Sequence, residues 1–157
     1  MRIIGIDPGT AILGFGVIDA IKDNLKMVDA GVIRTPVKEE DAIRLEIIYL
    51  ELSNIIKESK PTVMSVEKLF FAKNVTTAMT VSQARGVVLL CARQAKLDIF
   101  EYTPLQIKQS LTGYGRADKQ QIQEMVKITL KLREVPKPDD CADALAAAIT
   151  HSMMIQF

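Results

Sequence analysis

The N-terminal third of the chain alternates short apolar runs with polar turns. An apolar run over residues 2–7 ends in Asp7-Pro8-Gly9, and proline followed by glycine is a strong turn signal. Residues 12–21 and 26–34 predict two further strands, separated only by the polar residues 22–24. Because three successive strands with short connections pair with their neighbours, this region predicts an antiparallel meander.

The pattern then changes to a helical period. Ile43, Ile47, Leu50 and Ile55 are spaced to form the apolar face of a helix over residues 39–57. The elements predicted after it are a buried strand, a helix, a fifth strand and three terminal helices, at residues 63–66, 75–96, 97–102, about 104–111, about 118–132 and about 139–154. This order predicts one α/β domain over residues 1–157, with a five-stranded mixed sheet flanked by helices.

The helix over residues 75–96 is unusual because it is apolar on nearly all sides around Gly86. Such a helix is buried in a large interface, and we expect a contact between two copies of the chain. No continuous apolar run reaches the roughly 18 residues of a membrane span, so no membrane partner is expected. The charged N-terminus lacks the pattern of a signal peptide, which predicts a cytoplasmic protein.

Composition narrows the chemistry further. The two cysteines, Cys91 and Cys141, form no CxxC pair, so we expect packing roles and no zinc site or disulfide. The net charge is only +1, but residues 68–119 carry 8 basic and 3 acidic side chains between flanks that are net acidic. A basic middle third beside carboxylates suits a polyanion-binding surface, although a chance fluctuation of this size remains an alternative.

Four acids stand at positions that favour chemistry. Asp7 and Glu67 each end a buried apolar strand, where a carboxylate is costly unless it is paired, hydrogen-bonded or bound to metal. Asp140 and Asp143 share one face in the first turns of the last helix. Each acid alone has a structural alternative, such as a turn or helix cap, and Asp139 fits the N-cap region after Pro138.

Taken together, the four acids predict a metal site. Small residues at 142, 144, 146 and 147 would let the last helix pack closely on the sheet and bring its acids to the strand ends. An all-oxygen cluster suits Mg²⁺ or Mn²⁺, and two such ions can drive phosphodiester hydrolysis. The single histidine, His151, is expected to be structural or solvated because it lies about 12 Å along the helix from Asp143.

The sequence resembles the bacterial RuvC Holliday-junction resolvases, which have a ribonuclease-H-like fold, over essentially its whole length. The segments that carry the resemblance are residues 5–9 (GIDPG), Glu67 with Phe70, 72–74 (AKN), 83–86 (QARG), 106–109 (QIKQ), 113–119 (GYGRADK), 140–146 (DCADALA) and 149–151 (ITH). GIDPG alone is weak, because other ribonuclease-H-like and actin-like folds begin similarly. The whole ordered set is highly specific.

The resemblance implies roles for particular residues. The family's catalytic acids match Asp7, Glu67, Asp140 and Asp143, with none substituted. The positions that match or suggest DNA contacts are Phe70, Lys73, Lys108, Arg116 and Lys119, whereas Arg85 is either a DNA contact or structural. Without the resemblance, solvated surface lysines would be the better interpretation of the two lysines at 108 and 119.

The resemblance also implies an activity and partners. A homodimer would place two symmetric nicks across a four-way DNA junction during recombination and repair, using about two Mg²⁺ ions per site, for which Mn²⁺ can substitute. The RuvA–RuvB branch-migration complex is the implied partner. Two alternatives stay open: a related YqgF-type nuclease acting on RNA, and a non-catalytic DNA-binding module.

Overall fold

The computed structural model describes residues 1–22, 24–68 and 75–155. Within these ranges the predicted elements are present in the predicted order. Their bounds are β1 (Arg2–Asp7), β2 (Ile12–Ile21), β3 (Asn24–Arg34), α1 (Asp41–Ser59), β4 (Val63–Glu67), α2 (Val75–Gln94), β5 (Asp98–Tyr102), α3 (Pro104–Thr112), α4 (Lys119–Thr129) and α5 (Asp139–Met154).

The strands form one five-stranded sheet in the order β3-β2-β1-β4-β5. The β1–β2 and β2–β3 pairs are antiparallel, whereas β1–β4 and β4–β5 are parallel. The predicted mixed sheet, with three antiparallel strands first, is therefore confirmed. Because β1 and β4 are parallel neighbours, their carboxyl ends lie at the same edge of the sheet.

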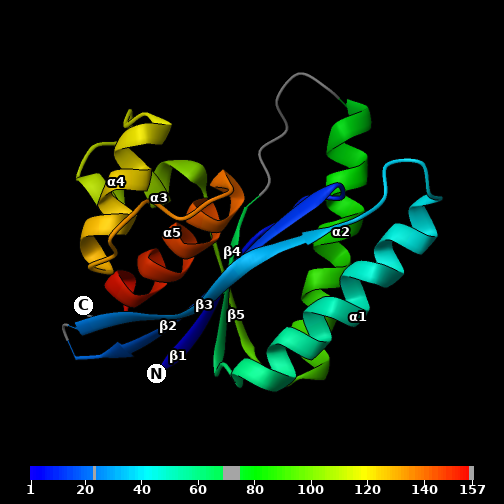
Figure 1. Cartoon of the computed structure of the whole chain (residues 1–157), viewed down its shortest axis with the longest axis horizontal. Helices are drawn as coiled ribbons and strands as arrows, with labels where there is room; N and C mark the ends of the chain where they lie inside the picture. Colours follow the sequence, from blue (N-terminus) through cyan, green and yellow to red (C-terminus); the bar gives the residue numbers. More distant parts are fainter. Residues whose placement is uncertain (23, 69–74, 156–157) are drawn as a thin grey trace.

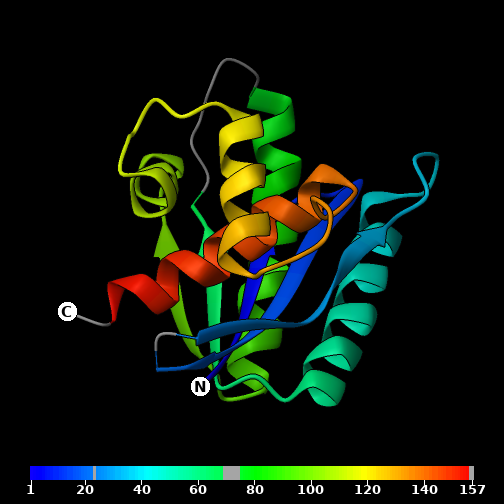
Figure 2. The same cartoon turned by 60° about the vertical axis from the view of Figure 1, so that its left-hand side comes forward.

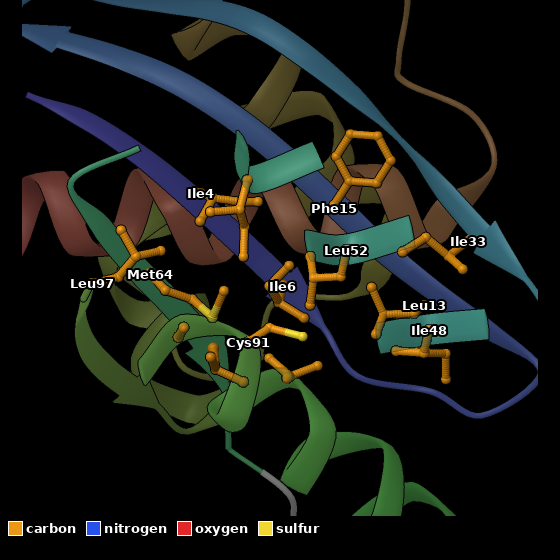
Figure 3. Close-up of a cluster of buried hydrophobic side chains, with 14 of the residues drawn as sticks. Ile4, Ile6, Leu13, Phe15, Ile33, Ile48, Leu52, Met64, Cys91 and Leu97 are labelled. Atoms are coloured by element: carbon orange, nitrogen blue, oxygen red, sulfur yellow. The ribbon is translucent and has the colours of Figure 1, made fainter. Parts of the chain in front are cut away.

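Helices cover both faces of the sheet (Figure 1). α1 and α2 lie on one face, and α5 crosses the other face, with α3 and α4 packed outside it (Figure 2). The α1/α2 side encloses a core to which β1 contributes Ile4 and Ile6 and α1 contributes Ile48 and Leu52 (Figure 3). A second core lies between the sheet and the three C-terminal helices, with Ile149 of α5 among its fully buried residues.

The predicted apolar face of α1 is wrong. Ile43 and Leu50 are 41% and 58% exposed, and Ile47 and Ile55 are only partly buried against the core. The stripe that the sheet covers consists instead of Ile48, Leu52 and Ile56. These residues are spaced four apart, so they lie on one face. The helix is rich in apolar residues at other spacings, and tertiary packing selected a different stripe.

α2 keeps much of its apolar surface exposed in the single chain. Its buried residues are Ala84, Val88, Cys91 and Ala92. Val75, Met79 and Leu90 are more than half exposed. By length and mean hydropathy α2 is the one described helix that could cross a membrane, a weak signal that core helices of soluble proteins also give. Contiguous exposed apolar surface on a helix is typical of interaction sites.

The cysteines and the histidine have structural surroundings. Cys91 and Cys141 are both buried and free of disulfides, as predicted. His151 is buried in α5, where its Nδ1 lies 2.8 Å from the hydroxyl of Tyr102. Phe100 covers the imidazole, with ring centroids 4.4 Å apart. His151 therefore joins α5 to β5, which confirms its predicted structural role.

Candidate active site

The two strand-end acids are neighbours across the sheet. The last paired residues of β1 and β4 are Ile6 and Val66, and Asp7 and Glu67 each follow one position later. Both acids are partly buried. Side chains two residues apart share a face of a strand, so these carboxylates point to the side on which Gly5 meets α5.

Two glycines let α5 approach that face unusually closely. A Cβ added to Gly5 would lie 2.0 Å from the carbonyl oxygen of Ala144, and one added to Gly14 would lie 2.1 Å from that of Asp140. Gly14 is also the β2 residue paired with Asp7. The backbone contact at Gly14 therefore fixes the start of α5 beside Asp7, as the small residues of this helix predicted.

This crowding changes the acidity of Asp7. Burial, followed by the negative charge of Glu67, raises the pKa of Asp7 from 3.8 to about 8. The charges of Asp143 and Asp140 raise it further, in that order of importance. Each of the other three predicted acids therefore lies close enough to Asp7 to raise its pKa.

The same causes act on the neighbouring acids. Burial and then the charge of Asp143 raise the pKa of Glu67 from 4.5 to about 7, against the opposing effect of Lys119 and Lys108. Burial also raises the pKa of Asp143, although Lys119 opposes that shift. Carboxylates that are shifted in this way, in a concave site, are typical of functional centres.

Lys119 reaches into the acids from α4. Asp118 caps this helix by accepting a hydrogen bond from the amide of Gln121 at 2.8 Å, so Lys119 occupies the first turn. Its Nζ lies 3.2 Å from carboxylate oxygens of both Asp139 and Asp143. Burial alone would lower the pKa of the Lys119 ammonium, but the two aspartates raise it.

The predicted capping role of Asp139 is wrong. The N-cap of α5 is Pro138, which has no acceptor side chain, and Asp139 begins the helix one residue later. Its carboxylate pairs with Lys119. The sequence contained no local signal for this contact, because the pair joins the first turns of two successive helices, α4 and α5.

A hollow of about 200 Å³ lies beside the acids. Its polar lining consists of Glu67, Lys108, Lys119 and Asp143, and the rest of the lining is mainly apolar. Two predicted DNA contacts, Lys108 and Lys119, thus lie at the site.

The other predicted DNA contacts are one exposed arginine and two residues outside the described ranges. Arg116 is exposed on the segment between α3 and α4, outside the lining of the hollow. Phe70 and Lys73 lie outside the described residues. Arg85 pairs with Glu101 of β5, and its Nε donates at 3.0 Å, which supports the structural alternative for this arginine.

The chemistry of the site suits a divalent metal ion. In the described part of the chain no three His, Cys, Asp or Glu side chains already surround a common metal position. The four acids nevertheless offer only oxygen donors, which Mg²⁺ and Mn²⁺ prefer. A divalent cation would offset the repulsion that raises the pKa values of Asp7 and Glu67. The residues present therefore fit such an ion.

Comparisons with known proteins identify a family. The model of the family described as crossover junction endodeoxyribonuclease RuvC matches residues 3–151. The protein of that name from Brevibacillus brevis is 54% identical over 157 residues, which cover 100% of this chain and 95% of the relative. The Halothermothrix orenii protein of the same name is 55% identical, covering 96% of this chain and 92% of the relative.

Solved structures agree with this match. Thermus thermophilus RuvC superposes with a TM-score of 0.93 at 33% identity, covering 99% of this chain and 96% of that one. The same protein in complex with a Holliday junction substrate gives a TM-score of 0.91 at 31% identity, with the same coverage. The fold is thus the ribonuclease-H-like fold that the resemblance implied, and the chain belongs to the RuvC family of crossover junction endodeoxyribonucleases.

Proposed function

We propose that this protein is a structure-selective endonuclease that resolves four-way DNA junctions during recombination and repair. The observation that carries the proposal is the convergence of Asp7, Glu67, Asp140 and Asp143 from two strand ends and one helix start. Burial, followed by the charges of neighbouring acids, raises the pKa of Asp7 to about 8 and that of Glu67 to about 7. Neither a turn nor a helix cap requires such a cluster. Membership of the RuvC family supports the same activity.

The four acids are the proposed ligands of a divalent metal centre, with two Mg²⁺ ions per site and Mn²⁺ as a substitute. When bound, such ions activate a water and stabilise the leaving oxygen of a phosphodiester. The acids orient the centre, and the narrow packing of α5 on β1 and β2 fixes their spacing. Because burial excludes water from the carboxylates, they attract a bound cation more strongly than solvated carboxylates would.

Two lysines are the proposed phosphate contacts at the centre. Lys119 already balances the charge of Asp143 at 3.2 Å, and Lys108 lines the same hollow. A substrate phosphate entering the hollow brings a negative charge beside several carboxylates, and these ammonium groups offset that repulsion. Lys73, Arg116 and Phe70 are proposed as further contacts to the DNA, with Phe70 placed against bases.

The exposed apolar face of α2 supports a homodimer. Met79 and Leu90 are 63% and 51% exposed, and they lie on a helix that the described residues cover on one side only. A two-fold dimer suits a near-symmetric junction because each of two strands of like polarity meets an equivalent site. Paired symmetric nicks then follow. The RuvA–RuvB branch-migration complex is the proposed partner. We propose that residues 1–157 form one nuclease domain, which acts in the cytoplasm.

A substrate comparison tests the proposal. The purified protein, with Mg²⁺, is offered a synthetic four-way junction, a linear duplex of the same sequences and a structured RNA, and the cuts are mapped at nucleotide resolution. We expect paired nicks at symmetric positions in the junction and little cutting of the other two. Preferential cutting of RNA would favour the YqgF-type alternative. Junction binding without any cutting, over a range of metals, would favour a non-catalytic binding module.

A further inference from the structure

The turn that follows Asp7 is held from two sides by hydrogen bonds that the proposed chemistry does not use. Thr10 is buried in this turn, and its hydroxyl donates to the carbonyl oxygen of Thr80 in α2 at 2.8 Å. In the cartoon the tip between β1 and β2 lies against α2 (Figure 1). Residues 70 positions apart along the chain are thereby joined, and one of them is three residues from Asp7.

The other side of the turn is fixed by β3 and α1. The hydroxyl of Thr35 donates to the carbonyl oxygen of Thr10 at 2.6 Å, and the same hydroxyl accepts from Nε of Arg44 at 2.9 Å. Thr35 is also buried, and its amide donates to the carbonyl oxygen of Ala11 at 3.1 Å. Thr10 is therefore the junction between a chain of bonds from α1 and a single bond to α2.

The bond to α2 is unusual because the helix does not need it. The carbonyl oxygen of Thr80 lies inside α2, where the helix supplies its own amide donor four residues later. The hydroxyl of Thr10 adds a second donor, and it is this bond that ties the turn to the helix. Removing the hydroxyl alone leaves the helix bond in place and removes only the hydrogen bond between the turn and α2.

From this geometry we infer that Thr10 is a positioning residue that couples α2 to Asp7. Thr80 follows Met79, which lies on the exposed apolar face proposed as the dimer contact. A shift of α2 caused by docking of a second copy of the chain or of DNA would therefore pass through the Thr10–Thr80 bond to the turn that follows Asp7. The inference rests on the proposed junction-cutting function. It assigns Thr10 to the cutting step and not to DNA binding.

Geometry explains why the hydroxyl matters for cutting. A catalytic group that is displaced by about 1 Å can lose about a hundredfold in rate, whereas binding spread over a large surface changes little. The test compares Thr10→Val, which keeps the shape and removes the donor, with Thr10→Ser, which keeps the donor. The control is Thr62→Val, because the Thr62 hydroxyl donates to the carbonyl oxygen of Arg2 at 3.1 Å, at the opposite end of β1.

Two quantities are measured on a synthetic four-way junction: the single-turnover cutting rate at saturating protein with Mg²⁺, and the Kd for the junction with EDTA. We expect Thr10→Val to slow cutting by about tenfold or more with an unchanged Kd. Thr10→Ser and Thr62→Val should cut at close to the wild-type rate. A rate for Thr10→Val equal to that of the wild type, a change confined to Kd, or failure of serine to rescue would overturn the inference.

Thr10→Ala protects the test against misfolding of Thr10→Val, because alanine also removes the donor to Thr80 and adds no bulk to the turn. It should slow cutting in the same direction with an unchanged Kd. An unaffected rate in a Thr10→Val protein that melts near the wild type, or in Thr10→Ala if Thr10→Val does not, contradicts the coupling. Wild-type protein that fails to cut the junction contradicts the proposed function itself, which separates the two failures.

Discussion

Replacing Asp7 with asparagine measures what it costs the folded protein to bury a carboxylate beside other acids. The folded protein raises the pKa of Asp7 from 3.8 to about 8. One pKa unit corresponds to about 1.4 kcal/mol. Without metal, the ionised Asp7 carboxylate therefore destabilises the folded state by at most about 6 kcal/mol. Side-chain movement and water entry reduce such costs. We therefore expect Asp7→Asn to stabilise the metal-free protein by about 2–3 kcal/mol at pH 8.

The pH dependence has a definite sign. Because Asp7 has the higher pKa in the folded state, that state binds the proton more tightly between about pH 4 and about pH 8. The free energy of unfolding of the wild type therefore falls as pH rises through this window and levels off above it. Asparagine removes the titration, so the stability advantage of Asp7→Asn is largest near pH 8 and shrinks toward pH 5.

Thermal unfolding in EDTA at pH 5 and pH 8 provides the assay. For a protein of this size about 1 kcal/mol shifts Tm by about 2–4 °C, so the expected gain at pH 8 is about 4–12 °C. Asp98→Asn is the control, because Asp98 is exposed at the start of β5, far from the acids along the sheet. An Asp7→Asn protein that melts at or below the wild-type temperature at pH 8 would refute the raised pKa of Asp7, as would an advantage that grows toward pH 5.

Three further predictions concern the packing, the charge and the surface. Gly14→Ala would put a methyl 2.1 Å from a backbone oxygen of α5, so we expect a loss of more than about 2 kcal/mol in chemical denaturation together with loss of cutting. Gly31→Ala, whose methyl meets only the movable ring of Phe15, should cost less, and equal costs would contradict the close approach. Lys119→Met removes a charge that lowers the pKa values of Asp7, Glu67 and Asp143, so the acidic limb of the pH–rate profile should move to higher pH; an unmoved or lowered limb would be inconsistent with that role. Leu90→Glu should convert a dimer to a monomer in sedimentation measurements, and an unchanged mass would exclude this face of α2 as the contact.

The four candidate acids could be selected from the sequence because they lie at the ends of regular elements. Asp7 and Glu67 end apolar runs, and a parallel pairing of those two strands is the only further step needed to bring them together. Asp140 and Asp143 follow from the helical period in the same way. Short-range periodicity thus predicted both the fold class and the elements that meet at the site.

The errors concern contacts that depend on tertiary structure. Ile43 and Leu50 fit a helical face, yet the sheet covers a neighbouring stripe, because α1 has apolar residues on more than one side. Asp139 was expected to cap α5, but the exact residue at which the backbone becomes helical decides which side chain can cap. The partner it found, Lys119, comes from another helix.

Close approach and long-range hydrogen bonds are equally hard to predict from sequence. Gly5 lies two residues before the end of β1, and Gly14 lies two residues after the start of β2. Glycines at such positions suit a flexible turn as well as contact with a helix. Only the opposing small residues of α5, such as Ala144, suggested the contact. Nothing local connects Thr10 with Thr80, since the bond depends on how α2 lies against the turn.

Junction cutting by Glu67→Gln and by wild type, as Mg²⁺ is titrated, tests most directly whether the acids form a metal centre. Glutamine keeps the size of the side chain but has no ionisable carboxyl, so it removes the group whose pKa is raised to about 7. We predict that wild type makes paired, symmetric, Mg²⁺-dependent nicks, whereas Glu67→Gln binds the junction with a similar Kd and does not cut at any Mg²⁺ concentration. Cutting by Glu67→Gln at the wild-type rate, or wild-type cutting that persists in EDTA, would contradict the account.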